Sequence, residues 1–262
     1  VFCRINKMKE TMGLNFNAKF SDVTYITSMG NDQTVVDSAR VSFNQDMVEG
    51  KTEYELDPSD QRLIKYLSDH GHWSPFSHCY VTFKINAPIF VARQLMKHQV
   101  GLAWNEVSRR YVDKDPEFWY PLSWRERAKN KKQGSTDHEV YGSQWINEKY
   151  RKAIELCEHT YKEMIKAGVC PEQARAILPQ SMLTQWYWSG SLYAFARVCN
   201  LRLMEDAQTE TRWIAESIAY YMANLFPISW KCLVSAYPLE REDKRSERMT
   251  EILDGTWPGP GV

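Results

Sequence analysis

The chain has 262 residues, of which 43% are apolar and 25% charged, as is ordinary for a globular protein with one large domain or two small ones. Lysine plus arginine and aspartate plus glutamate each number 33, so the formal net charge is zero. This balance argues against a general attraction to nucleic acid or to an anionic membrane, and any anionic ligand must be held by a local cluster of side chains.

The six cysteines are scattered and form no CxxC pair. This pattern argues against a zinc ribbon or a disulfide framework and favours reduced thiols in a cytoplasmic protein. The sequence has no run of about 18 apolar residues and no signal-peptide pattern, so we expect no membrane insertion.

Periodicity in the first part of the chain predicts strands and helices in turn. In chain order these are a strand at 23–27, a turn at 29–32, a helix around 37–41 running into Ser42, a helix capped by Ser59 or Asp60 and ended by Gly71, a strand at 80–85, and a helix opened by Pro88 and running to about Val100.

The second part of the chain is mainly helical in pattern, and we expect a single α/β domain. In chain order we expect an exposed loop at about 125–144, a helix to about Ala167, a short helix between Pro171 and Pro179, an extended segment at 183–188, and a helical pattern over 191–226 broken near Glu205. We expect residues 241–262, which are charged and then rich in Gly and Pro, to be a poorly ordered tail.

The segment KHQVGLAWNEVSRRYVD, residues 97–113, concentrates hydrogen-bonding side chains. If the helix from Pro88 continues to Val100, one donor-rich face of about 140° carries Arg93, Gln94, Lys97 and His98. The residues after Gly101 include Ser108, Arg109 and Arg110, whose donors suit a phosphate and the edge of a base. A structural network of ion pairs is the alternative interpretation.

Residues 105–111, Asn-Glu-Val-Ser-Arg-Arg-Tyr, follow Lys97-His98-Gln99 and together resemble the signature of the flavin-dependent thymidylate synthases. That signature is Arg-His-Arg, a short spacer, and Asn-Glu-x-Ser-x-Arg-Tyr. Further segments resemble family segments in the same order and cover most of residues 29–210: SMGNDQTVVDSARVSF, GHWSPFSH, FKINAPIFVARQ, ARAILP and NLRLMEDAQTE.

The resemblance implies a mixed α/β (α+β) fold with a central twisted, largely antiparallel sheet flanked by helices, in a single domain spanning about residues 1–240. It implies a homotetramer with active sites between subunits. It also implies conversion of dUMP to dTMP, with methylenetetrahydrofolate as carbon donor, FAD as redox mediator and NADPH as reductant.

The resemblance also assigns roles to individual residues. The dUMP-binding set is Gln94, Lys97, Glu106, Val107, Ser108, Arg109, Arg110, Arg175 and Arg202. The FAD-binding set is Ser42, Ser74, Lys97, His98, Gln99 and Glu106. His72 is placed near the flavin or folate. Arg202 would polarise the uracil as its C5 attacks a carbon, because a fixed positive charge stabilises an electron-rich ring. Ser108 would bind substrate rather than act as a covalent nucleophile.

This chain departs from the family pattern at several positions. Lys97 and Gln99 stand where the family has arginine, and the spacer that contains Ala103 is one residue longer. Lysine lacks the planar fork of arginine, and glutamine lacks its charge. In the later helices, family positions for FAD contacts are occupied by Ser191, Tyr193, Arg197 and Asp206, and we expect Arg197 to replace a lost charge.

Other patterns have a plain structural interpretation that we prefer. For the histidines of HGHWSPFSH, at 70, 72 and 78, we expect loop packing or a place beside the flavin rather than a metal site. For the acidic residues at 205, 206 and 210 we expect an exposed helix face. We expect the aromatic residues at 186–188 in the core or an interface.

Two other functions remain open. One is a single-stranded nucleic-acid-binding module that uses the aromatic residues and the Arg109-Arg110 pair, although the neutral net charge weighs against it. The other is a relative that binds flavin and nucleotide without methylating.

Overall fold

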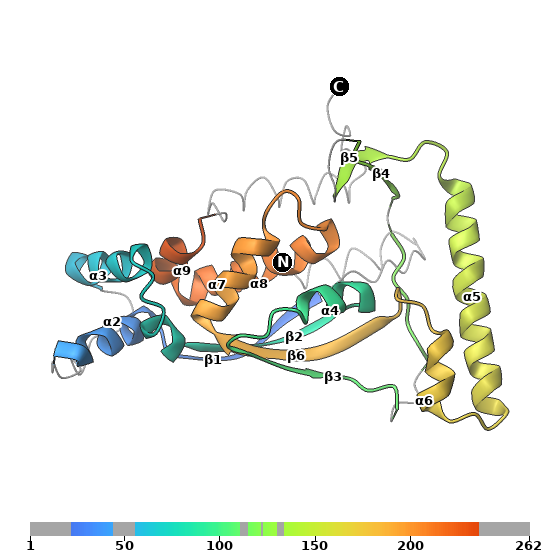
Figure 1. Cartoon of the computed structure of the whole chain (residues 1–262), viewed down its shortest axis with the longest axis horizontal. Coiled ribbons are helices and arrows are strands. Elements are labelled where there is room, and N and C mark those ends of the chain that lie inside the picture. Colours follow the sequence, from blue (N-terminus) through green and yellow to red (C-terminus); the bar gives the residue numbers. More distant parts are fainter. Residues whose placement is uncertain (1–21, 44–55, 111–114, 122, 130–133, 236–262) are drawn as a thin grey trace, which may run out of the picture.

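A computed structural model describes residues 22–43, 56–110, 115–121, 123–129 and 134–235, in which helices pack mainly on one side of a sheet (Figure 1). The tail predicted at 241–262 lies outside these residues. The strands are β1 (Asp22–Met29), β2 (Tyr80–Pro88), β3 (Leu102–Glu106), β4 (Arg125–Arg127), β5 (Ser135–Glu139) and β6 (Leu183–Ser191). The α-helices are α2 (Asp32–Arg40), α3 (Pro58–Asp69), α4 (Ile89–Leu95), α5 (Gln144–Lys166), α6 (Pro171–Ala174), α7 (Leu192–Arg202), α8 (Thr209–Leu225) and α9 (Pro227–Leu233), with 3₁₀ turns at Val41–Phe43, Pro75–His78 and Arg175–Ile177.

The main sheet has the strand order β1-β2-β6-β3 and each adjacent pair is antiparallel. Its register places Phe83 opposite Trp188 and Ile85 opposite Trp186. Because side chains alternate between faces along a strand, these four residues share one face, and all four are buried. The predicted antiparallel sheet flanked by helices is confirmed.

Helices α4, α7 and α8 cover this apolar face (Figure 1). Phe195 of α7 packs edge-on against Phe83 and Trp188, with ring centroids 5.2 and 5.4 Å apart. The opposite face is different, since Tyr80 and Tyr187 remain 44% and 48% exposed. One side of the sheet is thus the core, and the other is an open surface.

Two helices begin earlier than the sequence pattern predicted. Helix α2 begins at Asp32 because Asn31 caps it: the Asn31 side chain accepts the Thr34 N–H at 2.9 Å, and Thr34 Oγ1 accepts the Asn31 N–H at 3.1 Å. Helix α3 begins at Pro58, so the prediction that Ser59 or Asp60 caps it is wrong. Asp60 is instead buried inside the helix and paired with an arginine, Arg40 of α2.

The helix predicted from Pro88 to Val100 is much shorter in the structure. Pro88 ends β2, and α4 ends at Leu95; His98 N–H then bonds the Leu95 carbonyl in a tight turn. Gly101 has a φ of +76° and leads into β3, a strand that was not predicted. Lys97 and His98 therefore do not lie on an extended helical face with Gln94.

The prediction of a loop at 125–144 is also wrong in part. Strands β4 and β5 pair antiparallel, with Arg125 opposite Glu139 and Arg127 opposite Ser135, and α5 begins at Gln144. Most of the described side chains here are exposed, as expected. Ala128 is buried, and Arg125 is part-buried because its side chain pairs with the buried Glu210.

The remaining helical predictions hold. Helix α5 ends at Lys166 and stands with α6 at one end of the molecule (Figure 1). Beneath it lies a second small core of Phe118, Ile154 and Met182. Helices α7 and α8 are separated by a break at 203–208, close to the predicted position. None of the helices that the structure describes has the length and apolar character needed to cross a bilayer.

Candidate active site

Arg202 and His98 form the most constrained pair among the predicted site residues. Arg202 is the last residue of α7, and His98 lies in the turn between α4 and β3. The Nε of Arg202 donates a hydrogen bond to Nε2 of His98 at 2.9 Å. The fold thus joins two residues that are 104 positions apart, as their predicted roles at one site require.

Electrostatics keep His98 neutral. Burial lowers the pKa of His98 to about 4, and the positive charges of Arg202 and Arg197 add to this effect. Since Nε2 accepts from Arg202, the proton of the neutral ring lies on Nδ1. Among the described residues, no carboxylate pairs with Arg197 or Arg202, so this region carries positive charge that a ligand can neutralise.

Gln94 of α4 belongs to a chain of hydrogen bonds with residues at the start of α8. Its Oε1 accepts from Thr211 Oγ1 at 2.8 Å, and its Nε2 donates to Gln208 Oε1 at 2.6 Å. Gln208 Nε2 donates to Glu210 Oε2 at 3.0 Å, and Arg125 Nη2 donates to Glu210 Oε1 at 2.7 Å. The predicted nucleotide-binding amide is therefore held at both of its ends.

Glu106 is the last residue of β3 and is held from two directions. Thr184 Oγ1 donates to its Oε1 at 2.6 Å, and Trp104 Nε1 donates to its Oε2 at 3.2 Å. Trp104 in turn stacks on the buried Trp186, with ring centroids 4.3 Å apart. The aromatic layer thus fixes the position of a carboxylate at the edge of the sheet.

The residues after β3 gather donors beside α6. The Arg110 backbone N–H and Nε both donate to Ser108 Oγ, at 3.3 and 3.4 Å. Arg110 Nη1 also lies 3.8 Å from Glu172 Oε1, and Arg175 Nε donates to the Glu172 carbonyl at 3.3 Å. The structure therefore joins Ser108 to Arg110, and links both Arg110 and Arg175 to Glu172.

The other predicted residues are less constrained. Lys97 and Gln99 are exposed in the turn beside His98. Val107 is fixed by its backbone N–H to the Gln185 carbonyl, and Arg109 Nη2 reaches the Asp115 carbonyl at 3.5 Å.

The residues predicted near the flavin from the first part of the chain are exposed: Ser42, His72 and Ser74. The His72 ring lies edge-on to Tyr66 of α3, with centroids 5.9 Å apart. Within the described part of the chain, no hydrogen bond or ion pair joins these three residues to the other candidates.

Sequence reasoning missed four members of the site. Thr184 was read only as part of a strand, and Gln208 and Thr211 received no role although they lie in or beside the NLRLMEDAQTE segment. For Glu210 the prediction of an exposed acidic face is wrong, because the residue is buried and paired with Arg125. One signal in the sequence could have marked Glu210. It is the last residue of the NLRLMEDAQTE segment, and an acidic residue is favoured in the first turn of a helix.

The described residues include no cluster suited to a metal ion, and their two buried cysteines are poor nucleophiles. In the ranges that the structure describes, no three His, Cys, Asp or Glu side chains are grouped to hold a metal ion. Burial raises the pKa of Cys79 to about 12 and raises that of Cys199 as well, which disfavours the reactive thiolate.

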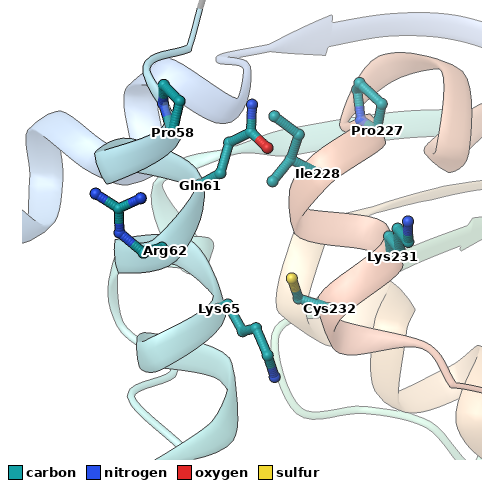
Figure 2. Close-up of a pocket in the computed structure, with 8 residues that line it drawn as sticks. All are labelled: Pro58, Gln61, Arg62, Lys65, Pro227, Ile228, Lys231 and Cys232. Carbon is teal, nitrogen blue, oxygen red and sulfur yellow. The ribbon is translucent and has the colours of Figure 1, made fainter.

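A groove of about 480 Å³ lies elsewhere, between α3 and α9 (Figure 2). Gln61 and Lys65 of α3 face Ile228 and Cys232 of α9 across it. None of the predicted site residues lines this groove, so it does not belong to the candidate active site.

Comparison with known proteins identifies the family. The family described as thymidylate synthase complementing protein matches residues 24–228, which are most of the chain. The chain belongs to the flavin-dependent thymidylate synthase family. The flavin-dependent thymidylate synthase of Thermosipho africanus is 34% identical over 203 residues, which cover 77% of this chain and 83% of that protein. That of Thermus thermophilus is 35% identical over 212 residues, covering 79% of this chain and 73% of that one.

A solved structure agrees with this family assignment. The UMP/dUMP methylase PolB from Streptomyces cacaoi, bound with 5-Br dUMP, superposes with a TM-score of 0.68 at 30% identity, covering 81% of this chain and 94% of PolB. The same methylase bound with 5-Br UMP gives a TM-score of 0.67. The chain is therefore similar in both sequence and fold to a nucleotide methylase.

The donor set of this family member fits a flavin nucleotide. Arg202 and Arg197 supply guanidinium groups that no described carboxylate neutralises, and His98 offers its Nδ1 proton. Lys97 and Gln99 extend this surface as exposed donors. Cations and N–H donors with no competing anion are what a pyrophosphate and an electron-rich ring require.

Proposed function

We propose that the chain methylates dUMP to dTMP, with methylenetetrahydrofolate as carbon donor, NADPH as reductant and FAD as redox mediator. The observation that carries the proposal is the Arg202–His98 pair, a part-buried guanidinium fixed by a neutral imidazole and left without a described carboxylate partner. Such a charge suits the stabilisation of an electron-rich pyrimidine.

Arg202 acts on the uracil ring in this proposal. The guanidinium stabilises the electron-rich form of the ring, whose negative charge lies on its oxygens and N3, before C5 gives an electron pair to the one-carbon unit. His98 holds the guanidinium by accepting from Nε, which leaves the terminal Nη groups to face the ring. The C5 proton then leaves, tetrahydrofolate is released from the one-carbon unit, and two electrons with a proton, originating from NADPH, reduce that unit to the methyl group.

The donors beside α6 hold the nucleotide phosphate. Ser108 contacts Arg110, both Arg110 and Arg175 contact Glu172, and the guanidinium groups match phosphate geometry. In the described part of the chain, Ser108 Oγ is contacted by the donors of Arg110 and not by a base. Ser108 therefore positions substrate and is not a covalent nucleophile.

FAD is proposed to lie against His98, Lys97 and Gln99, with Ser42, Ser74 and Glu106 as further contacts and His72 near the flavin or folate. When bound, it supplies the transfer of reducing equivalents from NADPH to the one-carbon unit. The protein contributes placement and electrostatics around it. The replacement of arginine by Lys97 and Gln99 leaves these contacts with less charge than the family pattern has.

The oligomer proposed is a homotetramer in the cytoplasm. The sheet face that carries Tyr80 and Tyr187 is exposed in the described part of the chain. Exposed tyrosines on an otherwise polar face are common at contacts between subunits. A partner subunit on this face would complete active sites between chains.

The single-stranded nucleic-acid alternative loses its main support. Trp186 and Trp188, which a stacking platform would need, are 1% and 0% exposed and belong to the core. The dTMP assay below distinguishes the proposed methylating enzyme from a relative that binds flavin and nucleotide without methylating.

The experiment is dTMP formation with FAD, NADPH, methylenetetrahydrofolate and dUMP, each omitted in turn, with UMP offered as a second acceptor. A yellow protein whose dTMP yield requires every component supports the proposal. A protein that takes up no FAD, forms no dTMP and shifts oligonucleotides with strong salt dependence overturns it. Uptake of FAD and dUMP without methylation indicates the non-methylating relative.

A further inference from the structure

The hydrogen-bonded chain around Gln94 has a direction that its own chemistry fixes. Glu210 is 3% exposed, and the carboxylate is paired with Arg125 at 2.7 Å. A carboxylate only accepts, so the group of Gln208 that faces Glu210 is its NH₂. The opposite end of that amide, Oε1, therefore faces Gln94.

The orientation of the Gln94 amide follows from that of Gln208. Because Gln208 offers an oxygen, Gln94 turns its Nε2 towards it and its Oε1 towards the hydroxyl of Thr211. An amide has two N–H donors and two acceptor lone pairs, and these contacts use one of each. One donor and one acceptor remain, at positions that the chain has determined.

We propose that Glu210, held by Arg125, is a positioning residue that sets which end of the Gln94 amide meets the nucleotide. The inference rests on the proposed function, in which Gln94 binds dUMP. It links the hairpin β4–β5 to the site, because Arg125 also donates from Nε to Ser135 Oγ of β5 at 2.8 Å. Neither Arg125 nor Glu210 needs to touch the substrate.

Replacement of Glu210 by glutamine is the sharpest test because it keeps the shape and inverts the chain. Arg125 is a donor only, so it holds the oxygen of the new amide and turns the new NH₂ towards Gln208. Gln208 then turns its oxygen to that NH₂ and its own NH₂ to Gln94. Gln94 reverses in turn, and Thr211 becomes the acceptor. The remaining donor and acceptor of Gln94 exchange places.

The readouts are the Kd of dUMP at equilibrium, and KM and kcat in the dTMP assay. For Glu210→Gln we expect Kd and KM for dUMP to rise about tenfold, as for the loss of an ordinary hydrogen bond, with kcat within about twofold. The matched control is Glu158→Gln, the same change in an exposed i,i+4 pair with Lys162 on α5. It should leave all three constants unchanged.

A double-mutant cycle tests whether Glu210 acts through Gln94. In a Gln94→Ala background, Glu210→Gln should have no further effect on the Kd of dUMP. An equal effect in both backgrounds overturns the proposal, as does a Glu210→Gln variant with the wild-type Kd.

A second pair of variants applies if Glu210→Gln does not fold. Thr211→Val removes the donor to Gln94 Oε1 and should raise the Kd of dUMP, and Thr211→Ser should restore it; equal Kd values in both overturn the proposal. The proposed function is tested separately by the wild type. Binding of dUMP without turnover refutes methylation alone, whereas failure to bind dUMP refutes both.

Discussion

Arg202 and His98 are joined by a hydrogen bond in which the arginine donates and the imidazole accepts, at 2.9 Å between Nε and Nε2. Two groups that commonly carry positive charge are thus in contact, and the contact is stable because only one of them is charged. Burial and the neighbouring Arg197 keep His98 neutral, with a pKa lowered to about 4. The pair positions one cation without adding a second.

The first prediction is a pH dependence of stability that His98 causes. The ordinary pKa of histidine is 6.5, and the pKa of His98 in the folded chain is about 4. Between these values the unfolded chain binds a proton that the folded chain does not, so acidification from pH 6.5 towards pH 4 favours unfolding. Below about pH 4 this contribution of the neutral ring is lost completely.

The measurement is the Tm of wild type and of His98→Asn between pH 7 and pH 4. The difference in Tm between wild type and His98→Asn should be widest near pH 7 and should narrow as the pH falls. His159→Asn on α5, at a histidine that is 69% exposed, is the control and should run parallel to wild type. A gap that stays constant across the range would contradict the neutral state of His98.

The second prediction concerns the charge of Arg202. Arg202→Met removes the guanidinium that stabilises the electron-rich ring, and kcat for dTMP formation should fall by about 10²-fold or more, as for loss of one preorganised donor. Arg202→Lys keeps the charge and should retain intermediate activity. A methionine variant with wild-type kcat would remove Arg202 from the mechanism, and FAD content measured by absorbance shows whether cofactor binding is affected.

Much of the fold could be predicted because it depends on local patterns. Alternation over Tyr80–Ile85 indicated β2, and Pro171 and Pro179 bounded the short helix. One failure, the overlong helix expected from Pro88, involves a tertiary contact. The turn after Leu95 leads to Gly101, which lies against α7, where a side chain would meet Ala194 Cβ at 3.1 Å. No periodicity within a window of residues reports that constraint.

The candidate site shows the same division. Family motifs pointed to Gln94, His98 and Arg202 from the sequence, and the fold joins His98 to Arg202 directly. The partners of Gln94 could not be derived, since Glu210 looks like any solvated acid until the fold buries it against Arg125. Long-range pairs of this kind are set by how elements pack and not by the residues next to them in the chain.

The third prediction separates binding from chemistry at Ser108. Its Oγ accepts both the backbone N–H and the Nε of Arg110, which keeps that guanidinium oriented. Ser108→Ala should raise KM for dUMP about three- to tenfold, as for one or two weak hydrogen bonds, with kcat little changed. Loss of turnover with an intact Kd for dUMP would show instead that Ser108 takes part in the chemistry.

The fourth prediction concerns Asp32, which joins the first and last helices of the described chain, α2 and α9. This residue of α2 is 5% exposed, and its carboxylate accepts the backbone N–H groups of Ile228 at 2.8 Å and Ser229 at 2.9 Å in the first turn of α9. Asp32→Ala leaves both donors without an acceptor in a buried place and should lower the free energy of unfolding by about 2–4 kcal/mol.

Denaturant unfolding measures the effect of Asp32→Ala, with Asp69→Ala as the matched control. Asp69 pairs with Lys65 on α3, but its side chain is 51% exposed, so its loss should change the free energy of unfolding by less than about 1 kcal/mol. Equal losses in the two variants would mean that the contacts of Asp32 with α9 contribute no more than a solvated ion pair. A larger loss for Asp32, with an unchanged denaturant slope, assigns the difference to the capping of α9 by a carboxylate from another helix.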